Sequence, residues 1–194
     1  GIPYRVIGGF RFYERLEIRD AIAYFRIVHK NNDDLSLERI FNTPKRGLGT
    51  ATLQVIYKLA RDANITLLDA SKKIIQTDEL GANARNSIKK FIEDIDRWKT
   101  KINKINHIEL ATIILEESGY SKMWLNNKSI EAPGRLENLK ELISALRDFS
   151  NMNEFLEHIS LVMENERNYK LDMVNIITMH SAKGLEFENV FLAG

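Results

Sequence analysis

Two loops of this 194-residue chain combine glycine with polar or basic side chains, as phosphate-binding loops do. The first is "HSAKGLEF", residues 180–187, which follows the apolar run "MVNIITM". A loop after a strand is where open α/β sheets collect ligands, because backbone amides and helix amino ends face that edge. It is not a Walker A loop, because Lys183 precedes Gly184 instead of following a glycine. An ordinary polar turn is the alternative.

The second loop is "TPKRGLGTAT", residues 43–52, where Lys45 and Arg46 stand beside Gly47 and Gly49. Two glycines let the backbone come close to a phosphate, amides at the start of the following helix donate to it, and two cations neutralise it. Such a loop holds a nucleic-acid backbone without reading bases. A plain connection between two helices is the alternative.

A third segment, "GGFRFYER", residues 8–15, mixes Phe10, Phe12 and Tyr13 with arginines, which suits stacking on bases beside phosphate contacts. The alternative is the core of a strand. The four histidines (His29, His107, His158 and His180) lack ligand spacing, so no metal site is predicted. Ser181 has no positioned base, so no catalytic triad is predicted.

The composition, 44% hydrophobic and 28% charged, is that of a globular chain. The net charge of +1 gives no overall attraction to nucleic acid, so a basic surface must be local. Without cysteine there is no disulfide, thiolate nucleophile or Cys-ligated zinc, and a reducing compartment fits. No apolar run is long enough to span a bilayer, and no signal peptide is predicted. Because the chain opens on Gly1 and not on Met, we expect a piece of a longer protein.

Apolar periodicity predicts helices over most of the chain. Thr50 is expected to cap the helix after the second loop, Asp34 to cap a short helix over 35–41, and Thr66 to form a capping box with Asp69. Gly119 is expected to end a helix in the left-handed conformation. One apolar stripe is predicted for 17–29 (Ile18, Ala21, Ile22, Phe25, Val28) and another for 82–105 (Ile88, Phe91, Ile92, Ile95, Trp98, Ile102), with further helices over 107–119, 135–149 and 153–164.

Strand patterns occur only near the two ends, in "PYRVIGG" (3–9), "MVNIITM" (173–179) and "NVFLAG" (189–194). The order strand, long helical region, strand is what a helical domain inserted into an α/β sheet would give, since the terminal strands can pair while the insertion packs on itself.

Together these segments closely resemble the superfamily 1 DNA helicases of the UvrD/PcrA/Rep type. "IPYRVIGGFRFYERLEIRDAIAYFR" is similar to the family's stretch after its fourth motif, "NTPKRGLGTATL" to its duplex-binding hairpin, and "VNIITMHSAKGLEFENVFLAG" to its fifth motif. The segments occur in order at family-like spacing and cover essentially all of the chain, with "ESGY" and "RLENLKEL" between them.

The resemblance implies a mainly α fold in which a helical 2B domain is inserted between strands of a partial RecA-like α/β domain, 2A. The implied boundaries are 1–27 for the first part of 2A, 28–171 for 2B and 172–194 for the second part of 2A. The family's Walker A and B motifs on domain 1A and its arginine finger are not in this sequence, so no catalytic set is complete.

The resemblance also implies roles for individual residues. Glu186 matches the residue that binds the sugar of ATP. Residues that match single-strand contacts are Gly8, Gly9, Phe10, Thr178 and His180, with Lys183 in the same loop. Residues that match the duplex-contacting hairpin are Lys45, Arg46, Gly47, Leu48, Gly49 and Thr52, with Leu48 where the family often has Ile.

The implied parent protein is a 3′ to 5′ ATP-dependent DNA helicase in DNA repair, in the bacterial cytoplasm, using ATP and Mg²⁺ that this chain alone would not hold. Its partners would be single-stranded and duplex DNA, domain 1A, the rest of 2A and repair proteins. Two alternatives are a non-enzymatic regulatory or protein-interaction module and part of a RecB-like helicase-nuclease, which shares motif five. The Gly-Leu-Gly hairpin and the compact insertion favour the UvrD type.

Overall fold

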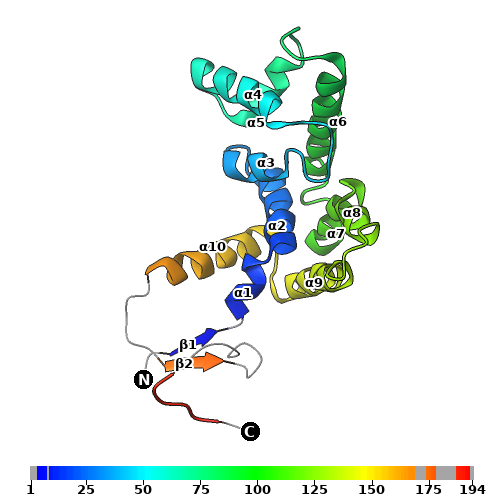
Figure 1. Ribbon diagram of the computed structural model, residues 1–194. Coiled ribbons are helices and arrows are strands. Elements are labelled where there is room, and N and C mark those ends of the chain that lie inside the picture. Colours follow the sequence, from blue (N-terminus) through cyan, green and yellow to red (C-terminus); the bar gives the residue numbers. More distant parts are fainter. Residues whose placement is uncertain (1–3, 8, 169–173, 178–186, 193–194) are drawn as a thin grey trace.

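A computed structural model of the chain describes residues 4–7, 9–168, 174–177 and 187–192 (Figure 1). Within these residues the fold is mainly helical, which confirms the expected class. The α-helices are α1 Gly9–Glu14, α2 Leu16–His29, α3 Asp34–Ile40, α4 Thr50–Ala63, α5 Leu67–Ile74, α6 Ala82–Lys99, α7 His107–Glu117, α8 Tyr120–Leu125, α9 Ala132–Ala145 and α10 Met152–Asn168, and a 3-10 turn spans Leu146–Asp148.

Two short strands from opposite ends of the chain lie side by side (Figure 1). β1, Tyr4–Ile7, pairs in parallel with β2, Val174–Ile177, in a register that runs from Tyr4 opposite Val174 to Ile7 opposite Ile177. Parallel strands need a crossover connection, and here it contains the whole helical region. The pairing brings segments from near the two ends of the chain together.

Two of the sequence expectations for the chain ends are wrong. Residues 9–14 form helix α1, so the strand-core alternative for "GGFRFYER" does not hold. Residues 187–192 form no strand, although "NVFLAG" has a strand-like composition. The side chains of Val190, Phe191 and Leu192 are exposed there, and an apolar strand is stable only when a sheet partner covers it.

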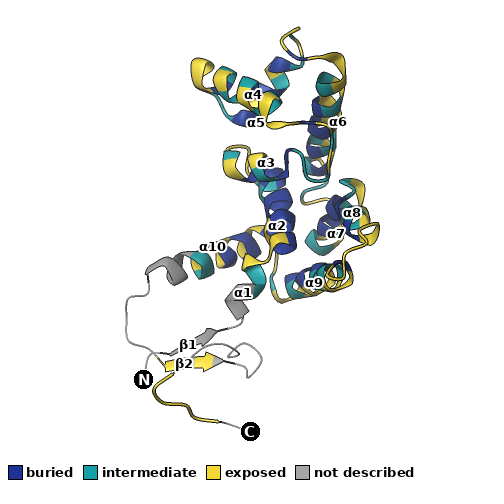
Figure 2. Cartoon of the chain, in the orientation of Figure 1, coloured by how far each residue is buried: buried dark blue, intermediate teal, exposed yellow. Residues whose placement is uncertain are grey.

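Helix α2 lies at the centre of the helical part and contacts α1, α3, α6, α7, α9 and α10 (Figures 1 and 2). The stripe predicted from its sequence is buried, but so are Ala23, Tyr24 and Ile27 on its other faces. Glu17 and Asp20 of α2 are buried too, because six neighbouring helices surround it on several faces. The sequence therefore predicted only part of the buried surface of α2.

Local helix signals are mostly confirmed. The hydroxyl of Thr66 caps α5 by accepting from the Asp69 amide at 3.1 Å. Gly119 is left-handed, with φ of 78°, directly after α7. The predicted face of α6 is buried at every expected position up to Trp98, whereas Ile102 lies beyond the end of the helix.

The cap of α3 is one residue earlier than expected. Asp33 accepts from the Ser36 amide at 3.0 Å, so Asp33 is the cap. Asp34 instead accepts from the Leu67 amide at 2.9 Å and joins α3 to the start of α5. From the sequence, Asp33 and Asp34 are equally good candidates for the cap of α3. The packing of α5 decides between them, because Asp34 binds the start of that helix.

Candidate nucleic-acid interface

The loop between α3 and α4, residues 41–49, is closed by the side chain of Asn42. Its Oδ1 accepts from the backbone amides of Arg46 at 2.7 Å and of Leu48 at 3.2 Å. Between them Gly47 has φ of +72°, a conformation that side-chain-bearing residues rarely adopt. Leu48 is only 2% exposed and anchors the loop in the core. The loop therefore has one defined conformation.

The amino end of α4 is open at the other side of this loop. Its N-cap is Gly49, which offers no side-chain acceptor, and Thr50 is the first helical residue, so the expected Thr50 cap is wrong. The first amides of a helix have no partner within the helix. A Cβ at Gly49 would meet nothing within 4 Å, so packing does not require glycine there. What the glycine does is leave the amides accessible to an anion.

Lys45 lies in the same loop, four residues before Gly49, and its side chain is exposed. Within the described part of the chain no hydrogen bond or ion pair engages its ammonium group. Thr52 is half-buried in the first turn of α4. The groups of this loop that are open to an anion are thus the exposed Lys45 side chain and the first amides of α4.

Arg46 points the other way, into the protein. One terminal nitrogen, Nη1, donates to the carbonyl oxygens of Ile40 at 2.8 Å, of Pro44 at 3.2 Å and of Phe41 at 3.3 Å. The other, Nη2, donates to the phenol oxygen of Tyr24 at 2.5 Å. This orientation does not favour the direct phosphate contact expected of Arg46.

Aromatic rings from two helices surround the Arg46 guanidinium. Its Cζ lies 4.3 Å from the ring centroid of Phe91 on α6 and 6.0 Å from that of Tyr24 on α2. The Tyr24 hydroxyl in turn donates to the Thr43 carbonyl at 2.5 Å. Tyr24 is fully buried, and burial raises its pKa above the ordinary value, so the hydroxyl keeps its proton. The loop is therefore tied to both α2 and α6.

Comparison with known proteins decides the family. The model of the UvrD-like helicase C-terminal domain matches residues 1–194. The chain belongs to this family. This UvrD-like domain is similar to DNA helicase II of Rickettsia typhi, with 46% identity over 196 residues. It is also similar to DNA helicase II of Escherichia coli, 38% identical over 204 residues, and to the ATP-dependent DNA helicase PcrA of Staphylococcus epidermidis, 36% identical over 204 residues.

The UvrD-like domain spans less than a third of the length of these relatives. All of the chain is matched in each case, but it covers 30% of the Rickettsia protein, 28% of the Escherichia protein and 27% of the Staphylococcus protein.

Three residues of the site were missed by sequence reasoning: Tyr24, Asn42 and Phe91. Asn42 carried a signal, because asparagine side chains commonly accept from backbone amides in turns. Tyr24 and Phe91 carried none beyond their apolar periodicity, since their contact with Arg46 bridges separate helices.

Other predicted site residues cannot be placed in this interface. Gly9 and Phe10 begin helix α1, and the Phe10 side chain is outside the described residues. Also outside them are Gly8, Thr178, His180, Lys183 and Glu186. Among the described residues no helix has the length and hydropathy to cross a bilayer, and no three acidic or histidine side chains are grouped to bind a metal.

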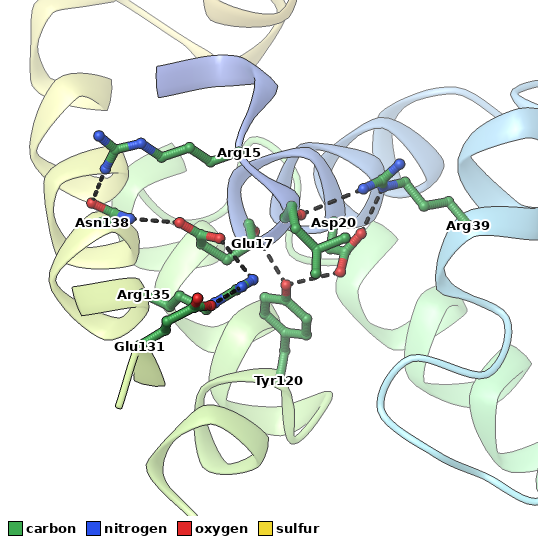
Figure 3. A network of polar contacts seen from close by, with 9 residues as sticks. Arg15, Glu17, Asp20, Arg39, Tyr120, Glu131, Arg135 and Asn138 are labelled. Carbon is green, nitrogen blue, oxygen red and sulfur yellow. Dashed lines mark hydrogen bonds and ion pairs between the residues drawn. The ribbon is translucent and has the colours of Figure 1, made fainter. Parts of the chain in front are cut away.

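A second polar cluster surrounds two carboxylates buried on α2 (Figure 3). Glu17 accepts from Asn138 at 2.5 Å and pairs with Arg135 at 3.3 Å, both on α9. Figure 3 also shows Arg15 donating to Asn138 and Arg135 paired with Glu131. The Glu17 carboxylate thus binds one charged donor, Arg135, and one neutral donor, Asn138, and these contacts join α2 to α9.

Asp20 is the other buried carboxylate (Figure 3). It pairs with Arg39 of α3 at 2.6 Å and accepts from the Tyr120 hydroxyl of α8 at 3.0 Å. Burial raises the pKa of Asp20, while Arg39 and Tyr120 partly offset that rise. Because both carboxylates have partners from neighbouring helices, we interpret this cluster as structural and not catalytic.

A hollow of about 590 Å³ lies between α2, α3 and α10 and is lined by three arginines. Arg39 is paired with Asp20, as described above. Arg26 donates to Ser160 at 3.0 Å and lies 3.8 Å from Asp33, and the third arginine of the described lining, Arg19, is exposed. Two of the three arginines are therefore near carboxylates of the protein itself. The amino end of α4, in contrast, has no side-chain cap.

Proposed function

We propose that this chain is the 2B domain, with flanking parts of domain 2A, of an ATP-dependent DNA helicase, and that the loop over 43–52 contacts duplex DNA. The proposed domain limits are 1–27 and 172–194 for 2A and 28–171 for 2B. The family match and the names of the relatives, DNA helicase II and ATP-dependent DNA helicase PcrA, support the helicase assignment.

The observation that carries the DNA contact is the open amino end of α4, preceded in the same loop by the exposed Lys45. Gly49 leaves the first amides of the helix uncapped, and the positive end of the helix dipole favours a phosphate there. The ammonium of Lys45, four residues before Gly49, adds a full positive charge to the same loop. Contacts of this kind position a duplex by its backbone and carry no base preference.

In the longer protein we propose that ATP and Mg²⁺ bind mainly through domains outside this chain, with Glu186 holding the sugar of ATP. Gly8, Gly9, Phe10, Thr178 and His180 would contact single-stranded DNA, with Lys183 in the same loop. Translocation from 3′ to 5′, a role in DNA repair with repair proteins as partners, and a place in the bacterial cytoplasm belong to the same proposal, which rests on the resemblance of these motifs.

The test is duplex binding by the 194-residue chain, measured by fluorescence anisotropy with two 20-base-pair duplexes of unrelated sequence. We expect equal affinity for both, and a slope of log affinity against log salt of about −1 to −2. Lys45→Gln should reduce the magnitude of that slope by about 1. Lys140→Gln is the control, because Lys140 is exposed on α9 and pairs with Glu137. An unchanged slope in Lys45→Gln would reject the contact.

A further inference from the structure

We infer that Arg46 is a positioning residue of the DNA contact and not a phosphate ligand. Its guanidinium holds the 41–49 loop in the conformation that leaves Lys45 and the α4 amides exposed. The inference rests on the proposed duplex contact of this loop and assigns a separate role to the second cation of the Lys45-Arg46 pair.

The first argument is the direction of the Arg46 hydrogen bonds. Nη1 donates to Ile40 and Phe41, the last residue and the C-cap of α3, and to Pro44 within the loop. Carbonyls at a helix carboxyl end have no partner within the helix, and a cation there also meets the negative end of the dipole. Arg46 therefore caps α3 and closes the loop with the same nitrogen.

The second argument is the rigid surface on which the guanidinium rests. Phe91 lies under it at 4.3 Å, and the Tyr24 hydroxyl accepts from Nη2. Tyr24 and Phe91 are 0% and 3% exposed, so neither ring is free to follow a moving loop. The loop is thereby fixed relative to α2 and α6, and the open end of α4 with it.

The third argument is that only arginine has this geometry. A guanidinium is a planar fork that can donate in several fixed directions while one face stacks on an aromatic ring. A lysine at position 46 would keep the charge, but a single ammonium cannot reach three carbonyls and a phenol while stacking on Phe91. Arg46→Lys therefore tests the geometry of the guanidinium separately from its positive charge.

Replacing the Arg46 guanidinium should lower the fraction of molecules in which the 41–49 loop has its binding conformation. The apparent dissociation constant rises as the inverse of that fraction, so a loop that is ordered about one-tenth of the time binds roughly tenfold more weakly. The number of phosphates neutralised in the complex does not change. Affinity should fall while the salt slope stays the same.

The experiment compares Arg46→Lys, Arg46→Gln and Lys45→Gln by duplex anisotropy between 50 and 200 mM salt, about the range in which phosphate contacts dominate. We expect Arg46→Lys and Arg46→Gln to weaken binding roughly tenfold at every salt concentration with the wild-type slope. Tyr24→Phe, which contacts no phosphate, should weaken binding in the same way. If Arg46→Lys binds like the wild type while Arg46→Gln loses about one unit of slope, Arg46 is a phosphate ligand and the inference is wrong.

A measurement without DNA separates this inference from the proposed function. The Leu48 amide, which donates to Asn42, should exchange its hydrogen faster in Arg46→Lys than in the wild type, while amides in the centre of α6 should not change. If the wild-type chain binds no duplex, the proposed contact fails, and the exchange result still decides whether Arg46 holds the loop. Unchanged exchange at Leu48 in Arg46→Lys would overturn the inference in either case.

Discussion

The indole Nε1–H of Trp98 on α6 donates a hydrogen bond to Oε2 of Glu117 on α7, over 2.7 Å. The same oxygen accepts from Arg97 at 2.7 Å, so one carboxylate joins the end of α6 to the end of α7. The hydrogen bond from Arg97, and then that from Trp98, lower the pKa of Glu117 below its ordinary value of 4.5. The same helix, α6, carries Phe91, the ring on which the Arg46 guanidinium rests.

Glu117→Gln should make the protein less sensitive to acid. A folded-state pKa below the unfolded one contributes stability above pH 4.5, and this is lost as pH falls through the folded-state value. We expect a shallower loss of stability below pH 4.5 in the variant, and a change at neutral pH of about 1 kcal/mol or less because the pair is partly exposed. Urea unfolding from pH 7 downward measures it. Glu116→Gln is the control, because Glu116 is the exposed neighbour of Glu117. Its free energy of unfolding below pH 4.5 should follow that of the wild type.

Tyr120→Phe should destabilise the junction of α2 and α8 by about 1–3 kcal/mol, because Asp20 loses a buried donor. The loss should be larger at neutral pH than in acid. Burial raises the pKa of Asp20 in the folded protein, so folding stability falls as the pH rises through the folded-state pKa and Asp20 ionises. Removing the Tyr120 donor takes a hydrogen bond from the ionised carboxylate and makes this fall in stability larger. Tyr57→Phe is the matched control, since the Tyr57 hydroxyl bonds Glu38 near the surface. Equal losses for the two variants would contradict this account.

Gly49→Asp should separate stability from DNA binding. An aspartate at the N-cap accepts from the amides of the first turn, so the free energy of unfolding should rise by a few tenths of a kcal/mol. The same carboxylate occupies and repels the proposed phosphate position, so duplex affinity should fall. Gly49→Asn caps without the charge and should weaken binding less. Calorimetry and anisotropy on the same samples check both effects, and tighter or unchanged binding by Gly49→Asp would count against a phosphate at this helix end.

The purified 194-residue chain should hydrolyse no ATP, with or without DNA. Its sequence has no phosphate-cradling Gly-rich Lys-Ser/Thr loop, which P-loop enzymes need to hold the transferred phosphate. A coupled assay of phosphate release, with and without single-stranded DNA, tests this. Activity that rises with DNA and copurifies with the chain would refute the expectation.

Several parts of the fold could be read from local sequence because neighbouring residues decide them. The buried face of α6 follows from apolar spacing, the Thr66 cap from a hydroxyl three residues before Asp69, and the Gly119 conformation from the absence of a side chain. Where the sequence was misleading, distant packing decided. Asp33 and not Asp34 caps α3 because Asp34 is used by the start of α5.

The sequence by itself determined the family, because the match extends over the whole chain. It also determined the helical class and the location of a glycine-rich basic loop, since these depend on residue types and on spacing within one or two helical turns. It could not determine what the two cations of that loop do. Lys45 and Arg46 are adjacent and carry the same charge, yet only Arg46 meets Tyr24, which is 22 residues away, and Phe91 on another helix. Tertiary packing turned Arg46 inward and left Lys45 exposed, since only the assembled α2, α3 and α6 offer the ring face and carbonyl oxygens that a guanidinium can bind.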